Sequence, residues 1–565
     1  MGRYLVTAGL PYSNGRLHVG HIAGCYLPAD IWVRYLRLRG EEVRYVCGSD
    51  DHGVAIMLTA TKEGKTPAEV AHFYNQQHQL DFKGLSIDFD VYGSTSASKF
   101  HRTASQHFFL SMLEKGLFEK RTTRQFFDEA RKMFLPDRFV KGDCGFCGAV
   151  EQNGDQCESC GKLLDVDSLK NVRSTLGSED ATVPGTAGVV TVRETVHWFL
   201  DLSRFQPQVE DWLQQAQLRD STRVYVKSLV NNGLVTRSMT RDIEWGIPLP
   251  IDDPDAKGKV LYVWFDAPIG YISNTMELME REQASEKAEG ACGEYEQWWK
   301  SKDSKIFHFI GEDNTIFHCL IWVAMLSAEG TFSLPSGVIV NQFLNIQFPD
   351  KDVEKISKSR GSAVWIGDYL QEGGDPDILR YYLTSIAPEK ARTVYKPEDL
   401  IQKNNADLAN VLGNFINRVL SFNQKYVGAI VPDYDPKKCD VVDHNFVNEL
   451  KRTFIEATEA LDNISPKHAL QILMDFARSC NKYIDDKKPW STRKTDMELT
   501  KVTLYHGIRA IYFLTITLSP FMPNKTKLVA QMLDIDLAQC NWNSAIDEFP
   551  VGKKLGEPVI LFQKI

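Results

Sequence analysis

The sequence predicts an α/β fold in which a Rossmann-like parallel sheet is split by an inserted module and followed by an α-helical bundle. Three observations predict this arrangement. The chain opens with a short apolar run, RYLVTAGL, which is followed by the turn YSNG and by an apolar-periodic stretch at 21–38. Two Cys-x-x-Cys pairs lie in a region of short segments, and apolar residues recur every three or four positions after about residue 400. A strand, a glycine-containing turn and a helix are typical of the start of nucleotide-binding α/β units.

The first half of the sheet is expected at residues 1–117. After the opening strand and helix, EVRYVCGSDDHG indicates a second buried strand that ends in small and acidic residues. A helix is predicted to follow at 67–83. Because open α/β sheets bind ligands at the carboxyl ends of their strands, these acidic residues are candidate ligand contacts.

The second half of the sheet is expected at 227–330. There GKVLYVWFDAPIGYIS and SKIFHFIGEDNTIFHCLIWVAML each indicate a buried strand that leads into a loop and a helix. The intervening region, 118–226, has short segments, many turns and the cysteine pairs, which is typical of an insertion. We therefore predict one sheet in two halves around an inserted module.

The C-terminal part, 399–565, is expected to be a helical bundle that is reached through a connecting region at 331–398. Its first helix has one apolar stripe, formed by Leu408, Val411, Leu412, Phe415, Ile416 and Val419. Further helices are predicted at about 443–462, 466–485 and 497–518.

The bulk composition limits the class of protein. A chain of 565 residues is too long for one core, so three or four domains of about 100–200 residues are expected. No apolar run approaches the roughly 20 residues that span a bilayer, and the N-terminus lacks a secretion signal. We expect a cytoplasmic protein with no membrane segment, whose 11 cysteines are reduced or metal-bound. The net charge of −9 excludes a surface coated with basic residues but leaves a local nucleic-acid-binding face open.

The stretch CGFCGAVEQNGDQCESCG predicts a metal site. Cys144 and Cys147 form one C-x-x-C turn, and Cys157 and Cys160 form a second. Two such turns supply the four sulfurs of a tetrahedral zinc site, and four protein ligands leave no open position. We therefore predict one structural Zn²⁺ per chain, with an iron–sulfur cluster as the lesser alternative.

Two histidines, His18 and His21, lie three residues apart just past a turn rich in Pro, Asn and Gly. By themselves they are consistent with metal ligands, a general acid and base, phosphate contacts, or ordinary helix residues. A second metal site is disfavoured because neither histidine has Cys or carboxylate partners at ligand spacing. The pair does not decide among the other roles.

A second motif lies far downstream, in DVEKISKSRG. It places Lys355 and Lys358 in a polar loop with Ser357, Ser359 and Gly361. Small residues let the backbone approach a ligand closely, and two ammonium groups can neutralise a polyphosphate. K-x-S-K-S is a weak pattern alone, but together with H-x-G-H at the start of an α/β unit it is specific. The two motifs together resemble the signatures of class I aminoacyl-tRNA synthetases.

Within that class the chain resembles the methionyl-tRNA synthetases over nearly its whole length. The matching stretches, in chain order, are LPYSNGRLHVGH, CGSDDHG, FLPDRFVKGDCGFCG with the second cysteine pair, SMTRDIEWGIPLP, YVWFDAPIGYIS, HFIGEDNTIFH, KISKSRG, NADLANVLGNFINR and DDKKPW. The isoleucyl, leucyl and valyl enzymes share both signatures but carry a long editing insertion, for which 118–226 is too short. The zinc of the cysteinyl enzyme keeps an open position for substrate, unlike a site of four cysteines.

The resemblance implies a site for ATP at the two signatures. His18 and His21 are expected to hydrogen-bond the ATP phosphates as charge shifts during adenylate formation. Gly20 is expected to let the backbone lie close to the nucleotide. Lys355 and Lys358 are expected to hold the departing pyrophosphate.

Three further positions are implied to bind ATP. Ser357 belongs to the same loop as the two lysines, while Gly311 and Asp313 follow the predicted strand of HFIGED, and Asp313 is expected to contact the ribose. Residue 312 is Glu where many family members carry Lys, which leaves any role of that cation in doubt.

The resemblance also implies a methionine pocket. Asp50, at the end of the second strand, is expected to bind the methionine ammonium group, with Arg241 near the carboxylate. The remaining pocket residues are Leu10, Tyr12, Trp264, Ala267, Pro268, Tyr271, Phe317 and His318. A thioether is favourable against aromatic rings, which fits this set. Without the other motifs, VWFDAPIGY would be explained as well by a core strand and turn.

In the helical bundle, the family reads the CAU anticodon of tRNA with residues that match Asn414, Arg418 and Trp490. A polar helix stripe is usually a solvent face, so this role rests on the resemblance. Stacking on an aromatic ring and hydrogen bonding to splayed bases are the general means of reading single-stranded RNA loops.

These expectations combine into a methionine–tRNA ligase with a Rossmann-like catalytic domain, a zinc-binding insertion and a helical anticodon-binding domain. Its expected partners are methionine, ATP with Mg²⁺, and tRNA(Met), and it is expected to act as a monomer. Two alternatives stay open from the sequence: another class I aminoacyl-tRNA synthetase, and a catalytically inactive tRNA-binding protein on the same scaffold.

Overall fold

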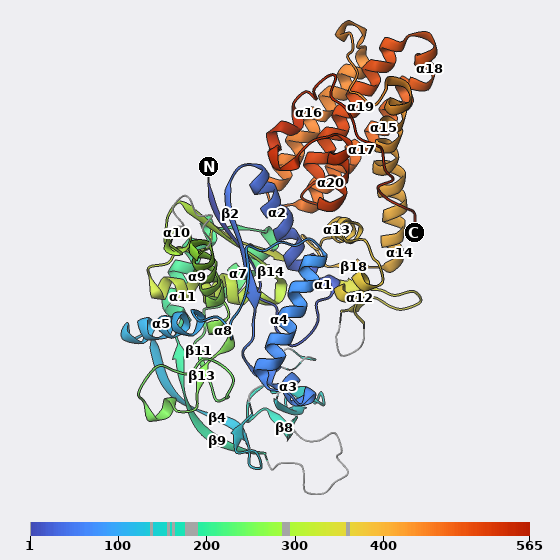
Figure 1. Cartoon of the computed structure of the whole chain (residues 1–565). Helices are drawn as coiled ribbons and strands as arrows, with labels where there is room; N and C mark the ends of the chain where they lie inside the picture. The colour runs from blue at the N-terminus through green and yellow to red at the C-terminus, as the bar shows by residue number, and fades with distance from the viewer. Residues whose placement is uncertain are drawn as a thin grey trace.

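A computed structural model gives the arrangement of the chain. It describes residues 2–135, 139–154, 157, 159–160, 164–175, 190–284, 294–356 and 362–565. A central α/β body carries a helical domain at one end and a β-rich arm at the other (Figure 1). Among the described residues, no helix combines the length and the apolar character that a membrane crossing requires.

The body is built around a six-stranded sheet in the order β10-β15-β14-β1-β2-β3, with every pair parallel. The strands are β1 (Arg3–Ala8), β2 (Glu42–Ser49), β3 (Val91–Ser94), β10 (Gln217–Leu218), β14 (Ser304–Gly311) and β15 (Gly337–Asn341). Leu5 and Val6 are both fully buried, but they belong to hydrophobic cores on opposite faces of the sheet. The predicted fold class is confirmed, and the strand order reverses between β1 and β14, where such sheets bind ligands.

Helices cover both faces of this sheet. The stretch predicted as a helix at 21–38 forms α1 (Val19–His21), a π-helical segment (Ile22–Tyr26) and α2 (Leu27–Leu38). The other helices of the body are α3 (Val54–Glu63), α4 (Pro67–Gly84), α5 (His101–Glu114), α6 (Gln206–Gln215), α7 (Asp220–Asn231), α8 (Val263–Asp266), α9 (Ile269–Ala284), α10 (Glu296–Trp299) and α11 (Trp322–Glu329). β10 lies within the range 118–226 that the sequence assigns to the insertion, and α7 begins in it, but β10 pairs with β15 in the main sheet.

The arm consists of two long antiparallel strands, β4 (Phe118–Asp128) and β9 (Val190–Leu200), with a small module at their far end (Figure 1). β5 (Met133–Phe134) and β11 (Arg237–Ser238) complete the arm sheet. The module is a three-stranded sheet of β6 (Val140–Cys144), β7 (Gln152–Asn153) and β8 (Leu169–Ser174). It has its own small core, which includes Phe126, Phe139 and Leu169.

Two small sheets complete the body, and the second of them leads into the helical domain. β12 (Thr240–Arg241) pairs with β13 (Val260–Leu261), and β17 (Glu354–Lys355), β16 (Leu344–Ile346) and β18 (Thr393–Tyr395) form a three-stranded sheet. Two helices follow on the chain, α12 (Ile366–Gln371) and α13 (Pro376–Ser385). This region therefore carries the second signature at Lys355.

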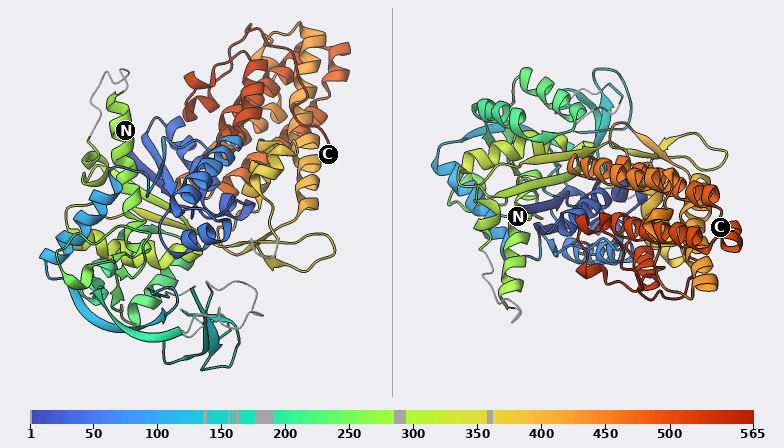
Figure 2. Two further views of the ribbon diagram at one scale, coloured as in Figure 1. Left: turned by 60° about the horizontal axis from the view of Figure 1, so that its bottom comes forward. Right: turned by 90° about the horizontal axis from the view of Figure 1, so that it is seen from above.

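The C-terminal domain is helical, as predicted. It comprises α14 (Pro397–Lys403), a π-helical segment (Asn404–Gly413), α15 (Asn414–Val427), α16 (Val441–Asp462), α17 (Pro466–Lys487), α18 (Pro489–Thr495), α19 (Met497–Leu518) and α20 (Pro523–Met532). The views in Figure 2 show this domain packed beside the N-terminal, blue half of the body. The contact is specific, because Trp32 Nε1 of α2 donates to Leu461 O of α16 at 3.1 Å.

One buried arginine joins the three parts that meet at this contact. Arg380 of α13 is fully buried, and its guanidinium donates to Asp30 Oδ2 of α2 at 2.7 Å. It also donates to the carbonyl oxygens of Leu85 at 3.2 Å, Pro520 at 2.7 Å and Phe521 at 3.0 Å. The body, α13 and the end of α19 are thereby fixed to one side chain.

The charge of Asp30 is compensated at this junction. Burial would raise the pKa of Asp30, but Arg34 and Arg380 outweigh it and hold that pKa below the ordinary value. A carboxyl whose folded-state pKa is depressed contributes stability above its unfolded pKa and loses it as the pH falls through the folded value. The junction is therefore expected to weaken in acid.

We expect Arg380→Met to lower the free energy of unfolding by about 3–5 kcal/mol, because it leaves buried carbonyls and a carboxylate short of donors. The measurement is the apparent midpoint of thermal unfolding at neutral pH. The control is Arg452→Met, since Arg452 is exposed and lies 3.8 Å from Glu456; its pair is worth at most about 1 kcal/mol. Equal effects of the two substitutions would contradict the proposed contribution of the Arg380 junction to the free energy of unfolding.

Candidate active site

The turn after β1 places the first signature at the carboxyl edge of the sheet. Tyr12 forms an isolated parallel bridge with Asp50, and the Ser13 N–H donates to Asp50 O at 3.0 Å. The chain then reaches His18, which is the N-cap of α1 in an extended conformation. The ends of β1 and β2 and the start of the first helix therefore meet at one place.

His18 and His21 cap the helix reciprocally. The Gly20 N–H donates to His18 Nδ1 at 3.1 Å, and the His18 N–H donates to His21 Nδ1 at 3.1 Å. The two rings stack with centroids 3.6 Å apart. Because each Nδ1 accepts a hydrogen bond, a neutral ring carries its proton on Nε2, which is a donor. Of the roles left open by the sequence, this geometry favours hydrogen-bond donation at a helix N-terminus, where anions bind.

Backbone pairing joins the first signature to the segment that follows the second signature. The Val19 N–H donates to Val364 O at 3.1 Å, and the Ile366 N–H donates to Leu17 O at 3.1 Å. Gly20 allows this close approach, since a Cβ there would lie 3.0 Å from Ile356 Cδ1. Ile356 immediately precedes Ser357 and Lys358, which lie outside the described residues.

Lys355 lies on β17, where it pairs with Asn345 of β16. Its ammonium group lies 4.3 Å from the centre of the Phe343 ring, a cation–π distance. Burial raises the pKa of Asp313, and the positive charge of Lys355 opposes that shift. The positive charge of Lys355 therefore acts on the carboxylate of Asp313, which follows β14.

Gly311 and Asp313 follow β14 as expected. A Cβ on Gly311 would lie 2.8 Å from Asp313 Oδ1, so the absence of a side chain lets the Asp313 carboxylate fold back over the strand end. The acidic residue between them, Glu312, pairs with the Arg392 guanidinium at 2.9 Å. A cation therefore lies beside position 312, supplied by a residue 80 positions further along the chain.

The predicted methionine pocket is assembled from three segments. Trp264 Nε1 donates to Tyr12 Oη at 2.5 Å, and the Trp264 and Phe317 rings lie 4.0 Å apart. Ala267 continues the helical turn of α8, and the Pro268 carbonyl accepts from the Tyr271 N–H at 3.2 Å. Leu10 packs close to Gly270, where a Cβ would lie 3.1 Å from Leu10 Cδ2.

A neutral polar pair lies at the back of this aromatic group. His318 Nδ1 donates to Asn314 O at 3.1 Å, so His318 Nε2 accepts from Tyr271 Oη at 2.8 Å. Burial lowers the pKa of His318 to about 4. The ring is therefore uncharged at neutral pH, which suits an apolar ligand.

Asp50 and Arg241 occupy different surroundings. Asp50 is buried, and burial together with the Asp266 and Asp51 carboxylates raises its pKa well above the ordinary value. Arg241 donates to Thr240 O at 2.8 Å, and its guanidinium lies 3.8 Å from the centre of the Tyr262 ring. Tyr262 in turn lies 5.4 Å from Trp264, ring to ring, so Arg241 borders the pocket through Tyr262.

The four clustered cysteines converge in the arm module. Cys144 Sγ lies 3.9 Å from Cys160 Sγ, and Cys147 Sγ lies 3.6 Å from Cys157 Sγ. All four sulfur atoms lie within 4.8 Å of one another. Four sulfurs at 2.3 Å from a tetrahedral ion are about 3.8 Å apart, so the described geometry fits a metal and not disulfides.

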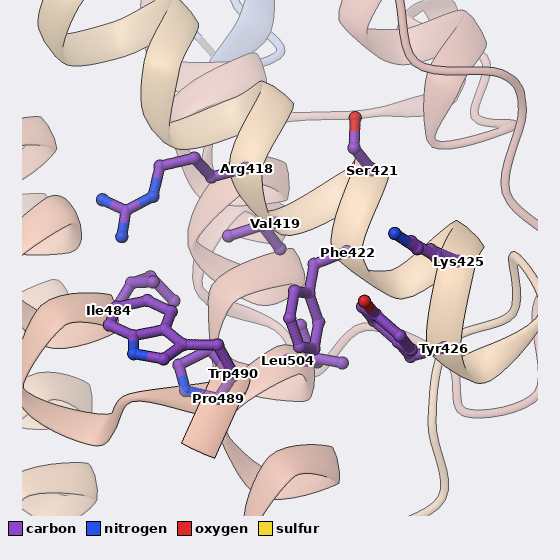
Figure 3. Close-up of a pocket in the computed structure, with 10 residues that line it drawn as sticks. All are labelled: Arg418, Val419, Ser421, Phe422, Lys425, Tyr426, Ile484, Pro489, Trp490 and Leu504. Carbon is purple, nitrogen blue, oxygen red and sulfur yellow. The ribbon is translucent and has the colours of Figure 1, made fainter. Parts of the chain in front are cut away.

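A separate cavity of about 300 Å³ lies in the helical domain (Figure 3). Arg418 and Trp490 line it, with the guanidinium 5.5 Å from the centre of the Trp490 ring and 2.7 Å from Asp485 Oδ1. Asn414 lies one helical turn before Arg418, and its amide donates to Asn481 Oδ1 at 3.0 Å. The cavity is also lined by Phe422, Tyr426, Lys425 and Ser421, among others.

Comparison with known proteins gives the family. The chain matches the family described as "tRNA synthetases class I (M)" over residues 4–420, and "Anticodon binding domain of methionyl tRNA ligase" over residues 435–565. A methionine–tRNA ligase of Porphyromonas gingivalis is 41% identical over 570 residues, which cover 100% of this chain and 79% of the relative. This chain belongs to the methionine–tRNA ligase family.

Two further comparisons agree with that membership. A methionine–tRNA ligase of Thermococcus kodakarensis is 38% identical over 577 residues, covering 100% of this chain and 74% of that relative. The fold is similar to that of the Mycobacterium tuberculosis methionyl-tRNA synthetase solved with methionyl-adenylate, with a TM-score of 0.79. That likeness covers 100% of both chains at 23% identity and concerns the fold alone.

Two groups of candidate functional residues in this chain were not predicted from the sequence. Phe422 and Tyr426 line the cavity one and two helical turns after Arg418, and their spacing of four residues was the available signal. A buried cluster of His52, His101 and Asp266 lies beside Asp50. For this cluster the only signal was His52 in SDDHG, because its partners are distant in the chain.

The low pKa of His318 has a consequence for stability. A histidine whose folded-state pKa is depressed from 6.5 to about 4 binds its proton more weakly in the folded protein. Protonation then favours unfolding, by about 1.4 kcal/mol per pKa unit, and the loss of stability develops as the pH falls from 6.5 toward 4. We expect His318→Gln to be less stable than the unaltered protein at pH 7.5, with a difference that shrinks toward pH 5.

The measurement is the apparent midpoint of thermal unfolding across that pH range. His468→Gln is the matched control, since His468 is exposed and its substitution is expected to change neither the midpoint nor its pH dependence. A difference between His318→Gln and the unaltered protein that stays constant with pH would contradict a buried neutral His318.

Proposed function

We propose that this chain activates methionine with ATP to form methionyl-adenylate and pyrophosphate, and then transfers methionine to the 3′ end of tRNA(Met). A methionine carboxylate oxygen attacks the α-phosphorus of ATP, and pyrophosphate leaves. The terminal ribose hydroxyl of the tRNA then attacks the methionyl carbonyl carbon, and AMP leaves. The observation that carries this proposal is the backbone pairing of residues 17–19 with 364–366, which brings the first signature beside the segment that follows Lys355 and Ile356.

The proposed ATP site uses positioning and charge rather than a covalent nucleophile. The Nε2–H groups of His18 and His21 would donate to phosphate oxygens at the start of α1, where the helix dipole also favours negative charge. Such donors matter most if they bind the transition state better than ATP itself. Lys355 would hold the pyrophosphate from β17, and Lys358 with Ser357 would do so from the loop that follows.

The remaining ATP contacts are proposed at the ends of the sheet. Gly20 and Gly311 leave room for the nucleotide beside the backbone, and Asp313 would accept hydrogen bonds from the ribose. Mg²⁺ would accompany the ATP phosphates, because this hard cation prefers oxygen ligands.

The proposed methionine site combines an apolar pocket with two charged ends. Trp264, Phe317 and the neutral Tyr271–His318 pair offer the polarizable surroundings that a thioether prefers. Asp50 would bind the ammonium group, and Arg241 would lie near the carboxylate. The other proposed lining residues are Leu10, Tyr12, Ala267 and Pro268.

We propose that Cys144, Cys147, Cys157 and Cys160 hold one Zn²⁺ that stabilises the arm module. The sulfur spacings of 3.6 Å and 3.9 Å support zinc-like tetrahedral coordination. Four protein ligands leave no position for a substrate, so the ion would have a structural role.

The cavity in the helical domain is proposed to bind the anticodon of tRNA(Met). Trp490 is 40% exposed, so its ring face is accessible to a base, and Arg418 and Asn414 offer donors beside it. Stacking together with base-edge hydrogen bonds is the usual means of reading an RNA loop.

We propose boundaries at 1–117 and 227–330 for the halves of the catalytic domain, 118–226 for the insertion, 331–398 for the connecting region and 399–565 for the anticodon-binding domain. We also propose a monomer. A cytoplasmic location is supported by the ten cysteines of the described residues, none of which forms a disulfide.

Amino-acid-dependent exchange of pyrophosphate into ATP tests the proposed reaction. We expect exchange with methionine and none with leucine, isoleucine, valine or cysteine. Stimulation by one of those amino acids would establish another class I activity, and no exchange with any amino acid would establish an inactive tRNA-binding protein. The comparisons favour neither alternative.

Lys355→Ala tests the assignment of the second signature. We expect it to lower the exchange rate about a hundredfold or more, since it removes a charge that stabilises the departing pyrophosphate. Methionine binding, measured by calorimetry, should change little. The control Lys305→Ala removes an exposed lysine at the opposite end of β14 and should leave exchange unchanged. Normal exchange by Lys355→Ala would refute the assigned role.

Removal of the metal tests the cysteine site. We expect about one zinc per chain by elemental analysis, and its loss in Cys147→Ser. The arm module should then become sensitive to limited proteolysis, because its small core is held by the metal. Cys540→Ser, in the helical domain, is the matched control and should retain zinc. Protease resistance that survives complete loss of zinc would overturn the structural role.

A further inference from the structure

Three buried side chains from separate segments meet beside Asp50. His52 follows β2, His101 begins α5, and Asp266 ends α8. His52 Nδ1 lies 2.6 Å from Asp266 Oδ2, and His101 Nε2 lies 3.6 Å from the same oxygen, just beyond hydrogen-bond length. His101 Nδ1 is 3.0 Å from Ser273 Oγ of α9. We call His52, His101 and Asp266 the histidine–aspartate cluster.

The cluster adjoins the proposed amino-acid site through the backbone. Asp50 and His52 belong to one tripeptide, and the His52 N–H donates to the Asp50 carboxylate. Asp266 follows Trp264 on α8, and Trp264 is hydrogen-bonded to Tyr12, which bridges Asp50. The charge of Asp266 therefore lies in the same buried region as that of Asp50.

Negative charge exceeds positive charge in this region. Asp50, Asp51 and Asp266 are all buried, and the imidazole of His52 is hydrogen-bonded to Asp266. Asp51 is held by hydroxyl and backbone donors of Ser94 and Ser96. Within the described chain, one oxygen of each carboxylate has no hydrogen-bond partner. A buried carboxylate without a cation is costly, so a region with three carboxylates and only His52 as a cation is short of positive charge.

A metal ion does not fit between His52 and Asp266. Ligand atoms about 2.1 Å from a tetrahedral metal are about 3.3 Å apart, whereas these two atoms are 2.6 Å apart. The geometry is that of a direct charge-assisted hydrogen bond. A ligand with its own donors can supply the missing positive charge beside Asp50.

We propose that the histidine–aspartate cluster is a positioning device: His52 neutralises Asp266, so that Asp50 is left as the carboxylate that captures the α-ammonium group of the amino acid. This inference rests on the proposed function, because it assigns the ligand of Asp50 as an amino acid. It adds His52, Asp266 and His101 as residues that act through Asp50 without touching the substrate.

The charges of the neighbouring groups support this division of roles. Burial would lower the pKa of His52, but Asp266 outweighs it and raises that pKa above the ordinary value. Burial would raise the pKa of Asp266, but His52 outweighs it and lowers that pKa. Burial lowers the pKa of His101, which stays neutral. The titratable groups that face one another here are Asp50, Asp51, His52, His101, Asp266 and Tyr271.

Removing one charge of the pair should change methionine binding in a pH-dependent way. In His52→Gln the negative charge of Asp266 is uncompensated, so the Asp50 carboxyl loses its proton only at a higher pH. At a lower pH the protonated Asp50 binds the ammonium group weakly. In Asp266→Asn the opposing carboxylate is gone, so Asp50 ionises at lower pH. In the double variant both charges are absent, and Asp50 returns to surroundings of unchanged net charge.

The experiment measures the KM for methionine and for ATP in pyrophosphate exchange from pH 5.5 to 8.5. We expect His52→Gln to raise the methionine KM about tenfold at pH 7, with a defect that shrinks toward pH 8.5, which corresponds to a shift of about one pH unit. The ATP KM should stay within about twofold, because the phosphates are bound elsewhere. The double variant His52→Gln/Asp266→Asn should recover most of the methionine KM.

A matched control separates this effect from a general loss of histidine. His107 lies on the same helix as His101 but is 63% exposed, so His107→Gln should leave the methionine KM and its pH profile unchanged. A His52→Gln defect that is equal at every pH, or a double variant at least as impaired as His52→Gln, would overturn the proposal.

Two further arms keep the test decisive. If His52→Gln does not fold, Asp266→Asn alone is measured: its acidic limit for methionine binding should move to lower pH, and movement to higher pH overturns the proposal. If the unaltered protein shows no methionine-dependent exchange, the proposed function fails and this inference fails with it. If the unaltered protein shows normal methionine-dependent exchange but the effect of the variant on the methionine KM does not depend on pH, the role of the histidine–aspartate cluster is refuted and the proposed function is not.

Discussion

The buried Arg380–Asp30 ion pair is the constraint on which the arrangement of this protein depends. It lies where α2, α13 and the end of α19 converge, and Arg380 replaces the water that the backbone carbonyls there would otherwise bind. Around it, the core of the body continues without interruption into that of the helical domain. Because buried charged networks tolerate little displacement, the body and the helical domain are held in a fixed relation. The aromatic cavity between α15 and α18 is thereby set at a defined distance from the sheet edge.

At that sheet edge, local hydrogen bonds determine where the imidazole donors point. His18 and His21 each use Nδ1 to cap the helix, and this fixes the proton of a neutral ring on Nε2. A capping interaction thus orients the donors that we propose for the ATP phosphates. The Tyr271–His318 pair works in the same way, since satisfying both imidazole nitrogens keeps a buried ring neutral. Local hydrogen bonds therefore determine the electrostatic character of the site.

The sequence predicts those parts of the fold whose signals are local. The opening strand, the helix at 21–38 and the helix at 67–83 follow from apolar period and turn residues, and the structure has them at nearly the expected bounds. The four cysteines are recognisable from spacing alone and converge as expected. The π-helical segments and the two-residue strand β10 leave no such local signal, because they depend on tertiary pairing.

The candidate site was predictable only as far as its motifs extend along the chain. The union of the two signatures depends on pairing between residues more than 300 positions apart, which spacing cannot reveal. The Arg392 partner of Glu312 and the Asp266 partner of His52 are long-range in the same sense. A sequence without aligned relatives identifies residue types that suit a reaction, but charge compensation between distant segments requires the folded chain.

The measurement that tests this account most directly is aminoacylation of total tRNA. The purified protein is incubated with ATP, Mg²⁺, total tRNA and all twenty amino acids, and the charged tRNAs are identified by sequencing with mass spectrometry of the attached residue. The account predicts methionine on tRNAs with a CAU anticodon and negligible charging of any other tRNA. A different amino acid on the charged tRNA, or methionine attached without regard to anticodon, would contradict it.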